Sequence, residues 1–413
     1  MIESFLLLLA LNPSTQNPFS TAPAVAETER LALTPKLDGR MEEEEWDMFS
    51  SSGGVDTAFQ WQPGRLHAAA KIPAGQAMIL SLDLKNNGWL VGDDNYEVRV
   101  RWIGDRPEAR VRRLDATNPN GPKWAEAMMF QEAVSCSAVV SGGFVVAELT
   151  LTDPGLKLLP EKSGEKLGLR IDGVPAGESE LEAFLPRVMA PVKLTLDRGS
   201  SVPGGLQWRP QLVSRVVAPG AGIRIRMTFN GANELQLKRA ELRTEGLASE
   251  ETTQLAVPFP CFDNKGRAFI DYNTDIPGQA SEGYRILRTT ITDAQGQKAV
   301  LRTSYEIAPI VVFDLAAPGK VKATDKEQRV KCSAYARNNT SRRVDGTLRV
   351  AAPAGWEVLS GDDKGFTIYS AYGSVRRVFE LLIPPGTKGT FPIKLQADMG
   401  GKGYTQTEWI TIE

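Results

Sequence analysis

Residues Tyr96 to Trp102 alternate between apolar and charged side chains without a break, and this pattern constrains the fold more than any other stretch. Successive side chains of a β-strand point to opposite faces, so the alternation predicts a strand with one buried face. Trp102 is in phase with Val98 and Val100, and we therefore expect it to lie in the core. Similar short runs recur between turns that use many of the 38 glycines and 26 prolines. This organisation predicts an all-β protein built of sandwiches.

The chain has 413 residues, which is too long for one ordinary hydrophobic core. Breaks in the strand pattern fall near Met189-Ala190-Pro191 and at Ala308-Pro309. We therefore expect three consecutive β-sandwich domains, at residues 27–197, 199–308 and 310–413. The second unit has about seven short strands in roughly 110 residues, as is typical of an immunoglobulin-like sandwich. The third unit repeats this theme, so the last two domains are both predicted to be immunoglobulin-like.

One short helix is expected in the first domain, over Arg40 to Phe49. Acidic residues would occupy its first turn, where the helix dipole favours them, and Trp46 would face the core. The four consecutive glutamates of this segment could instead form a metal site. Neighbouring helical positions point about 100° apart, so a solvated helix face is the interpretation that we prefer.

The N-terminal segment, residues 1–26, is similar to an export signal. A short apolar run at Phe5 to Leu11 precedes Ala24-Val25-Ala26, which offers a small-x-small cleavage site. No basic residue precedes the run, and Glu3 stands there instead, so a packed or disordered segment is the alternative. The run is too short to span a membrane, and no other stretch could do so. We expect a secreted or cell-surface protein.

Nothing in the sequence indicates catalysis. The single histidine, His67, lies in a predicted strand, and the sequence lacks a GxSxG motif, a glycine-rich phosphate loop and an HExxH motif. Cys136, Cys261 and Cys332 fall one in each predicted domain, which argues against an intradomain disulfide or a zinc site. The net charge of -2 gives no reason to expect nucleic acid. The chain is therefore predicted not to be an enzyme; a glycosidase that uses two carboxylates, which needs no histidine, is the alternative.

Five short motifs follow one another at about residues 27–197: Leu37-Asp38-Gly39, Glu44-Glu45-Trp46, Gly92-Asp93-Asp94-Asn95, Phe144 to Leu149 and the closing Lys166 to Asp172. Their order and spacing resemble those of carbohydrate-binding module family 9. The family typically opens with Asp-Gly and Glu-Trp, continues with an acidic elbow before an alternating strand, and has a late strand with a glutamate. The elbow here has Asn95 where the family usually has serine.

This resemblance implies an extracellular β-sandwich that binds a polysaccharide or another glycan. Aromatic side chains would stack on the apolar face of a sugar while acids and amides bond its hydroxyls. Trp89 and Trp124 lie at predicted turns and are the preferred stacking residues, although either could serve packing instead. The full set of candidates is Trp61, Trp89, Trp102 and Trp124, with Asp93, Asp94, Asn95 and Asn120 as hydrogen-bonding partners.

The acidic elbow has a second possible role. Asp93 and Asp94, with backbone carbonyls, could hold Ca²⁺, a hard cation that takes oxygen ligands. Such residues also form turns by bonding their own backbone, and this is the interpretation that we prefer. No other cofactor is expected.

The third predicted domain resembles the small immunoglobulin-like domains attached to secreted glycosidases. Ala352 to Val358 and Ile383 to Gly386 carry this resemblance, which implies a spacer or an interaction module. The sequence as a whole predicts a non-catalytic extracellular carbohydrate-binding or cell-surface protein. A structural or interaction protein of the cell envelope, with protein partners and no sugar site, is the alternative. The deciding observation is whether Trp89, Trp124 and Asp94 converge on one open surface.

Overall fold

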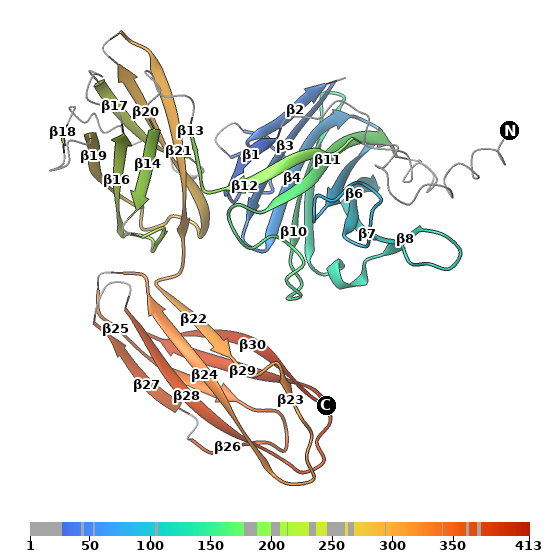
Figure 1. The fold of residues 1–413 in the computed structure, drawn as a ribbon, viewed down its shortest axis with the longest axis vertical. Helices are drawn as coiled ribbons and strands as arrows, with labels where there is room; N and C mark the ends of the chain where they lie inside the picture. The colour runs from blue at the N-terminus through green and yellow to red at the C-terminus, as the bar shows by residue number, and fades with distance from the viewer. Residues whose placement is uncertain are drawn as a thin grey trace.

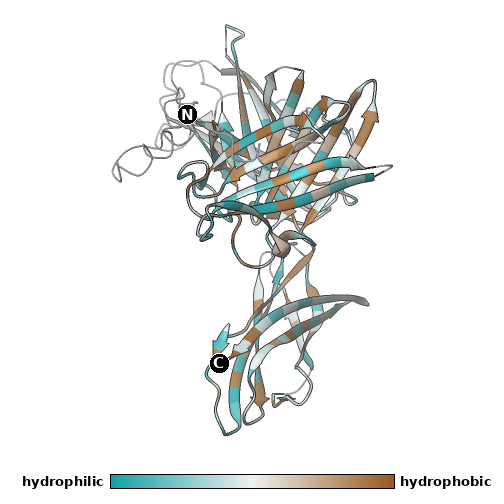
Figure 2. Cartoon of the chain, turned by 90° about the vertical axis from the view of Figure 1, so that its right-hand side faces the viewer, coloured by the Kyte–Doolittle hydropathy of each residue, from teal (hydrophilic) through white to brown (hydrophobic). Residues whose placement is uncertain are grey.

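The computed structural model has three β-sandwich units in a row, the last two of them immunoglobulin-like, as the sequence predicts (Figure 1). Apolar and polar residues alternate along the strands, so each unit buries the apolar faces between its sheets (Figure 2). No described residues form a helix that could cross a membrane. The described residues are 27–42, 45–52, 54–103, 106–176, 188–199, 207–212, 214–230, 237–245, 261–262, 268–293, 295–340, 342–360, 363–369 and 373–413. The predicted leader, residues 1–26, lies outside them.

The first unit packs a seven-stranded sheet on a five-stranded one. The core between them includes Phe59, Leu80 and Val98, each with no exposed surface. In spatial order the larger sheet contains β1 (Thr28–Leu31), β12 (Ala190–Thr195), β11 (Lys166–Pro175), β5 (Gln76–Asp83), β6 (Asn95–Ile103), β7 (Arg106–Asp115) and β8 (Lys123–Glu126). The smaller contains β2 (Met48–Ser52), β3 (Val55–Gln62), β4 (Arg65–Pro73), β10 (Phe144–Thr152) and β9 (Val134–Ser141). A short 3-10 helix, η1 (Met128–Phe130), follows β8.

The second unit has two sheets, and so has the third (Figure 1). The second contains β13 (Asp197–Gly199), β21 (Lys298–Ile307), β20 (Gly283–Asp293), β17 (Leu237–Glu245) and β15 (Val216–Val217), opposite β14 (Gln207–Leu212), β16 (Gly222–Asn230), β19 (Ala268–Asp275) and β18 (Cys261–Phe262). The third contains β22 (Val311–Ala316), β24 (Gln328–Asn338), β28 (Ser374–Ile383) and β26 (Glu357–Val358), opposite β23 (Lys320–Val321), β30 (Lys402–Ile412), β29 (Gly389–Met399), β25 (Val344–Ala351) and β27 (Asp363–Ile368).

The helix expected over Arg40 to Phe49 is wrong for the described residues of that segment. One turn is present, in which the Trp46 N–H donates to the Glu42 carbonyl at 2.8 Å, and β2 begins at Met48. Pairing of β2 with β3 overrides the local helical preference. Trp46 is buried against the outer face of the five-stranded sheet, so its packing role is as predicted. The middle glutamates, at positions 43 and 44, lie outside the described residues.

The prediction that Trp102 lies in the core is also wrong. Tyr96, Val98 and Val100 are buried, in the predicted phase, but Trp102 is 36% exposed. It pairs with Pro107 near the end of the β6–β7 ladder. The alternation of a strand sets the face on which a side chain lies, but it does not set how far the facing sheet extends. Glu97, on the opposite face of β6, is fully buried.

The first and second units are joined by hydrogen bonds as well as by the chain. The Thr34 N–H donates to the Tyr284 carbonyl at 3.0 Å, and the Tyr284 N–H donates to Thr34 Oγ1 at 2.8 Å. The Arg285 guanidinium donates to the Thr34 carbonyl at 3.3 Å. Leu31 and Leu33 pack nearby on Ile286. The segment that follows β1 therefore fastens the first sandwich to the start of β20 in the second.

Gly283 makes this close approach possible, and its replacement tests the junction. The residue has φ +123°, and a Cβ there would lie 2.8 Å from Thr34 Oγ1. We expect Gly283→Ala to weaken the junction by about 1–3 kcal/mol, through backbone strain and the displaced hydroxyl. Faster amide hydrogen exchange at Thr34 and Tyr284 would report it. Gly278→Ala is the matched control, because no atom lies within 4 Å of its added Cβ. Equal exchange rates in the two variants would contradict the prediction.

Candidate functional site

The acidic elbow is a turn that bonds its own backbone. Asp94 is only 7% exposed, and its Oδ2 accepts the Lys85 N–H at 3.1 Å. Asn95 has no exposed surface; its Oδ1 accepts the Leu90 N–H at 3.1 Å and its Nδ2 donates to the Val91 carbonyl at 2.7 Å. These bonds hold residues 84–94 against the end of β5. The side chains of Asp94 and Asn95 are therefore engaged inside the protein.

Asp83 completes this loop and was not singled out from the sequence. Its carboxylate accepts the Asn87 N–H at 3.2 Å and the Gly88 N–H at 2.7 Å. Burial raises the pKa of Asp83, the two backbone N–H groups oppose that rise, and nearby Asp94 adds to it. The loop is thus anchored at both ends by carboxylates, from Asp83 and Asp94.

Asp93 is the exposed member of the elbow. Its carboxylate forms an ion pair with Arg113, whose Nε also donates to the Asp93 carbonyl at 2.7 Å. Among the described residues, no group of three or more histidine, cysteine, aspartate or glutamate side chains could hold a metal ion. The Asp93 and Asp94 carboxylates, which the sequence offered as calcium ligands, thus bond Arg113 and the backbone of the loop.

Trp89 and Trp124 lie side by side, but Trp89 and Asp94 are buried, so the three residues do not converge on one open surface. The ring centroids of Trp89 and Trp124 are 5.5 Å apart, at an interplanar angle of 36°. Trp89 comes from the loop after β5 and is only 5% exposed, whereas Trp124, on β8, is half-buried. Trp124 therefore presents ring surface to solvent, while Trp89 packs beside it. Trp61 is 1% exposed, and its Nε1 donates to the Arg30 carbonyl at 2.9 Å, so it belongs to the core.

Behind Trp124 lies a charged row that crosses the outer face of the seven-stranded sheet. The Arg112 guanidinium carbon is 5.8 Å from the centroid of the Trp124 ring, within the range of a cation–π contact. Arg112 also forms an ion pair with the fully buried Glu97, its cross-strand neighbour. Arg99 Nη2 lies 3.7 Å from the same Glu97 carboxylate. The exposed tryptophan is thus supported by a fixed ion-pair cluster.

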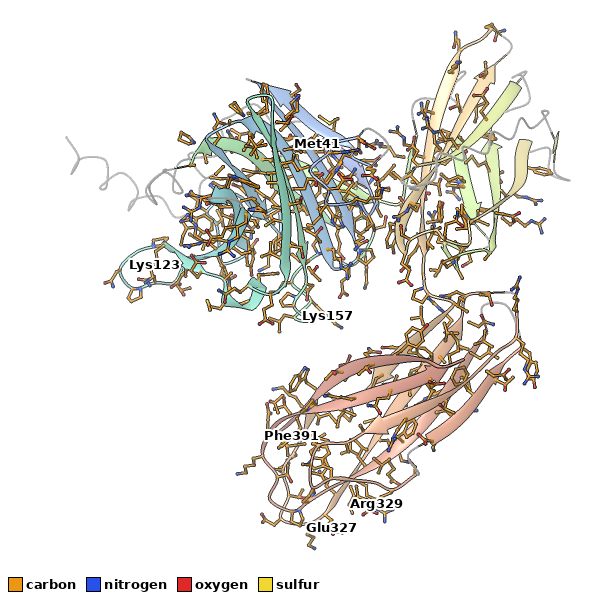
Figure 3. The ribbon with its side chains drawn as sticks, turned by 180° about the vertical axis from the view of Figure 1, so that it is seen from behind. Met41, Lys123, Lys157, Glu327, Arg329 and Phe391 are labelled. Carbon is orange, nitrogen blue, oxygen red and sulfur yellow. The ribbon has the colours of Figure 1, made fainter. Side chains whose placement is uncertain are left out.

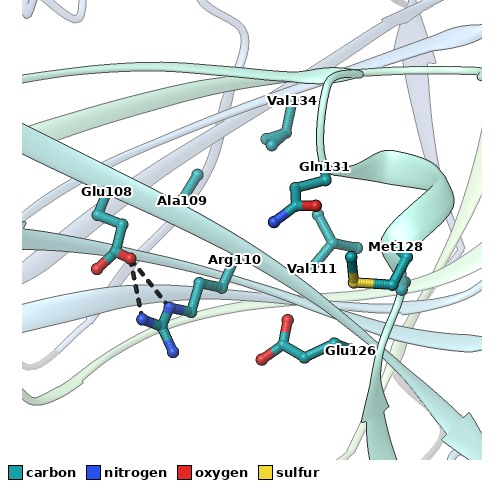
Figure 4. Close-up of a pocket in the computed structure, with 9 residues that line it drawn as sticks. Glu108, Ala109, Arg110, Val111, Glu126, Met128, Gln131 and Val134 are labelled. Carbon is teal, nitrogen blue, oxygen red and sulfur yellow. Dashed lines mark hydrogen bonds and ion pairs between the residues drawn. The ribbon is translucent and has the colours of Figure 1, made fainter.

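The charged row continues along β6 and β7 to a pocket at the sheet edge. Arg101 and Arg110 share the Glu108 carboxylate, at 3.4 Å and 3.0 Å. The pocket has a volume of about 290 Å³, with Glu126 and Met128 on its far side (Figure 4). Charged side chains and Met128 line this pocket, so it can bind a molecule that has both polar groups and an apolar surface.

Asn120 lies in the loop between β7 and β8, on the approach to Trp124. Its N–H donates to Asn118 Oδ1 at 3.0 Å, and its side chain is exposed. Lys123, at the start of β8, lies at the end of the first unit that is remote from the second unit (Figure 3). Asn120 and Trp124 therefore belong to the free end of the sandwich, where loops are open to a ligand.

The sequence interpretation did not include Arg112, Glu97, Glu108 and Arg110 in the site. The sequence does indicate such a row, because the charged residues between Tyr96 and Trp102 all fall on the polar face of the predicted strand. Aligning the charged residues of β6 with those of β7 in an antiparallel register predicts this row of ion pairs from the sequence.

His67 has the environment of a packed residue and not of a general base. Its Nδ1 lies 2.8 Å from Thr150 Oγ1, and its Nε2 has no partner among the described residues. Burial, with a smaller effect from Arg65, lowers the pKa of His67 to about 3. The imidazole therefore stays neutral at physiological pH.

Glu148 connects two of the motifs that resemble the carbohydrate-binding family. Its carboxylate, in the late strand, accepts the Gly39 N–H of the Asp-Gly motif at 2.6 Å. Burial raises the pKa of Glu148 to about 7, against the opposing effect of that N–H. A Cβ at Gly39, which has φ +81°, would collide with Val139. These motif positions thus have a packing role that is independent of any ligand.

Comparisons with known proteins add little. No family model matches the chain, and a search of curated proteins finds no match. Among solved structures, Escherichia coli alpha-2-macroglobulin activated by porcine elastase is similar at TM-score 0.24 and 8% identity, over 91% of this chain and 45% of that one. The native conformation of the E. coli protein gives TM-score 0.24 and 9% identity, over 88% and 32%. A Salmonella alpha-2-macroglobulin mutant gives TM-score 0.24 and 10% identity, over 89% and 31%. The chain spans less than half of each, and likenesses this weak carry no information on function.

Proposed function

We propose that the chain is a non-catalytic carbohydrate-binding protein, secreted or held at a cell surface, whose first unit binds a glycan. The observation that carries this proposal is the half-exposed Trp124, packed beside Trp89 and backed by Arg112. A ring held in this way offers a rigid surface for the apolar C–H face of a sugar. Because the supporting contacts already exist without ligand, little ordering entropy would be lost on binding.

The neighbouring polar groups suit the rim of hydroxyls on a sugar. Asn120 is exposed in the loop that leads to β8, and Glu108, Arg110 and Glu126 border the pocket at the other end of that strand. Carboxylates accept hydrogen bonds from hydroxyls, guanidinium groups donate to them, and amides do both. Trp89, Asp94 and Asn95 take a supporting role in this proposal, because they are buried and hold the loop beside Trp124.

The proposal predicts a loss of glycan binding in Trp124→Ala. Removing the stacking surface should weaken binding at least tenfold, which corresponds to about 1.4 kcal/mol. A glycan array followed by titration calorimetry on the strongest ligand would measure this change. Trp409→Ala is the matched control, since Trp409 is 58% exposed in the third unit and should leave binding unchanged. Absence of wild-type binding to any glycan, or equal binding by Trp124→Ala, would count against the proposal.

A second candidate function is that of an interaction protein of the cell envelope. It is favoured by apolar side chains on the β9–β10 hairpin, where Val139, Val140 and Phe144 are 43%, 48% and 37% exposed. Exposed apolar side chains on an edge strand such as β9 are typical of protein contact surfaces. Capture of an envelope protein that persists in Trp124→Ala and is lost in Val140→Lys would support this alternative.

A further inference from the structure

A cavity of about 390 Å³ opens at the end of the third unit that faces the second unit (Figure 1). Val311 and Phe313, from β22, line one side of it, and Leu395 and Tyr404, from β29 and β30, line the other. β22 is the edge strand of one sheet, and β29 and β30 belong to the opposite sheet, so the cavity is a slot between the two sheets. Its volume lies in the range of about 300–1,000 Å³ that is usual for small-molecule sites.

The wall of this slot is mainly apolar and partly aromatic. The ring centroids of Phe313 and Tyr404 lie 5.2 Å apart, at an interplanar angle of 46°. Phe313 also contacts Phe366 edge-on, at 6.1 Å, so contacts with two rings fix its orientation. Aromatic faces attract apolar groups and also cations. The wall therefore suits a ligand with an apolar body, and it tolerates a positive charge on that ligand.

Glu306 is the only charged side chain among the described residues that line the slot. It comes from the end of β21, in the second unit. No ion pair or hydrogen bond joins its carboxylate to another residue in the described part of the chain. The side chain is only half-buried, so its carboxylate oxygens remain accessible to a ligand in the slot. The slot thus combines an apolar wall with a single negative charge that has no bonded partner.

The surroundings of Glu306 favour an added cation. Burial raises the pKa of Glu306, Arg337 opposes that rise, and Glu282 adds to it. Arg337 is exposed and, as the described residues lie, forms no ion pair with Glu306. Dehydration of the carboxylate therefore outweighs the attraction of Arg337. A cation bound in the slot would offset this penalty, because opposite charges interact more strongly where water is excluded.

Hydrogen bonds on both sides of the interdomain connection hold Glu306 in place. On the side of the second unit, the Glu306 N–H donates to the Arg215 carbonyl at 2.7 Å. On the side of the third unit, the buried Asn339 donates from its N–H to the Ile310 carbonyl and from Nδ2 to the Pro309 carbonyl, both at 2.9 Å. The carboxylate is therefore preorganised relative to the aromatic wall, which lowers the entropy lost when a ligand binds.

We propose that this slot binds a small organic ammonium ion with an apolar body. The ammonium group pairs with the Glu306 carboxylate, and the body lies against Phe313 and Tyr404. An ammonium group is a compact charge with three donors, and the hydroxyl of Thr405, which also lines the slot, can accept one of them. Organic anions are disfavoured, because the described lining contains no cationic side chain.

The bound ammonium ion would stabilise the observed arrangement of the second and third units. Its charge contacts the second unit and its body contacts the third, so it binds this arrangement better than one in which the units have moved apart. The slot shares no residue with the Trp124 surface of the first unit. Ammonium binding and glycan binding are therefore independent, and Trp124→Ala should bind the ammonium ion as the wild type does.

The test uses the full chain and three probes of similar shape but different charge. Titration calorimetry at neutral pH should show saturable binding of 2-phenylethylammonium to the wild type. The neutral analogue 2-phenylethanol should bind about tenfold more weakly, because it lacks the charge that pairs with Glu306. The anion 3-phenylpropionate should show no saturable binding.

Glu306→Gln keeps the size of the side chain and removes its charge. Binding of 2-phenylethylammonium should weaken about tenfold or more. The thermal midpoint should not fall, since the carboxylate bonds no described residue and its dehydration is relieved. Glu327→Gln is the matched control, because it makes the same exchange on an exposed residue at the end of the third unit remote from the slot (Figure 3). It should bind the ammonium ion as the wild type does.

A second variant keeps the test decisive if Glu306→Gln folds poorly. Val312 is half-buried in the lining, so Val312→Trp places a large ring in the slot and should abolish binding of 2-phenylethylammonium and 2-phenylethanol alike. Three outcomes would overturn the proposal: no saturable binding of 2-phenylethylammonium by the wild type, equal affinity for 2-phenylethanol, or unchanged binding in folded Glu306→Gln or Val312→Trp.

Discussion

Replacing Trp61 with alanine is expected to lower the free energy of unfolding of the first unit by about 3–5 kcal/mol. The side chain is only 1% exposed, and its loss leaves a large cavity between the sheets. It also removes the Nε1 hydrogen bond to the Arg30 carbonyl. The Leu33 N–H donates to the Trp61 carbonyl at 3.1 Å, so the segment after β1 should loosen as well.

Denaturant unfolding, with hydrogen exchange in β3 and β4 as the local reporter, would measure this change. Trp409→Ala is again the control, and a substitution at such an exposed site should change stability by no more than about 0.5 kcal/mol. A decrease in the free energy of unfolding of less than about 1 kcal/mol in Trp61→Ala would show that Trp61 does not pack in the core between the sheets. It would also reopen the possibility that Trp61 contributes to a ligand site.

The second large effect concerns pH, and it begins with Glu148. Its pKa rises from an ordinary 4.5 to about 7 in the folded protein, mainly because of burial. Between these values the folded state holds a proton that the unfolded state has released, so stability falls as pH rises. The whole penalty is present above pH 7 and is on the order of 3 kcal/mol. Asp38 adds to the rise, and the Gly39 N–H and Trp46 oppose it.

His67 has the opposite effect over an overlapping range. Its pKa falls from 6.5 to about 3 on folding, so between these values the unfolded state binds a proton that the folded state does not. Stability therefore falls as pH decreases below 6.5, by about 1.4 kcal/mol per pH unit. From pH 4.5 to 6.5 the contributions of Glu148 and His67 have opposite signs and nearly cancel.

Two substitutions should separate these contributions. In Glu148→Gln, which can still accept the Gly39 N–H, stability relative to the wild type should rise with pH between 4.5 and 6.5. In His67→Asn, which can keep the contact to Thr150, it should fall with pH over the same range. Urea midpoints at pH 4.5, 5.5 and 6.5 would measure both slopes. The same dependence of stability on pH in the two variants would refute the opposite contributions assigned to Glu148 and His67.

Much of the fold could be predicted because each sandwich has simple local rules. The alternation of Tyr96 to Val100 follows from a strand with one face in the core, and Pro63-Gly64 marks the turn between β3 and β4. The expected helix at Arg40 to Phe49 fails because residues from Met48 onward pair with the next strand, β3. Local propensity contains no information about a partner strand that lies later in the chain.

The candidate site was predictable only in part, for a related reason. Loop positions identified Trp89 and Trp124, and the two rings do meet. Burial separates them, however, because Trp89 is only 5% exposed within a loop that Asp94 and Asn95 hold in place. Those two side chains were expected to contact a ligand, and their bonds go to the backbone instead. Whether a polar side chain at a turn points inward or outward depends on how the loop packs against the rest of the domain. The spacing of residues along the chain does not contain this information.

The strand order of the first unit has a consequence for its synthesis on the ribosome. β1 pairs in parallel with β12, and Leu31 lies opposite Thr195. The N-terminal edge of the larger sheet therefore remains open until Thr195 has left the exit tunnel. β13 then pairs with β21, with Asp197 opposite Thr303, so the second unit has the same requirement. Vectorial synthesis thus makes the first unit complete its sheet well before the second, and the nascent chain exposes one unpaired strand edge after another.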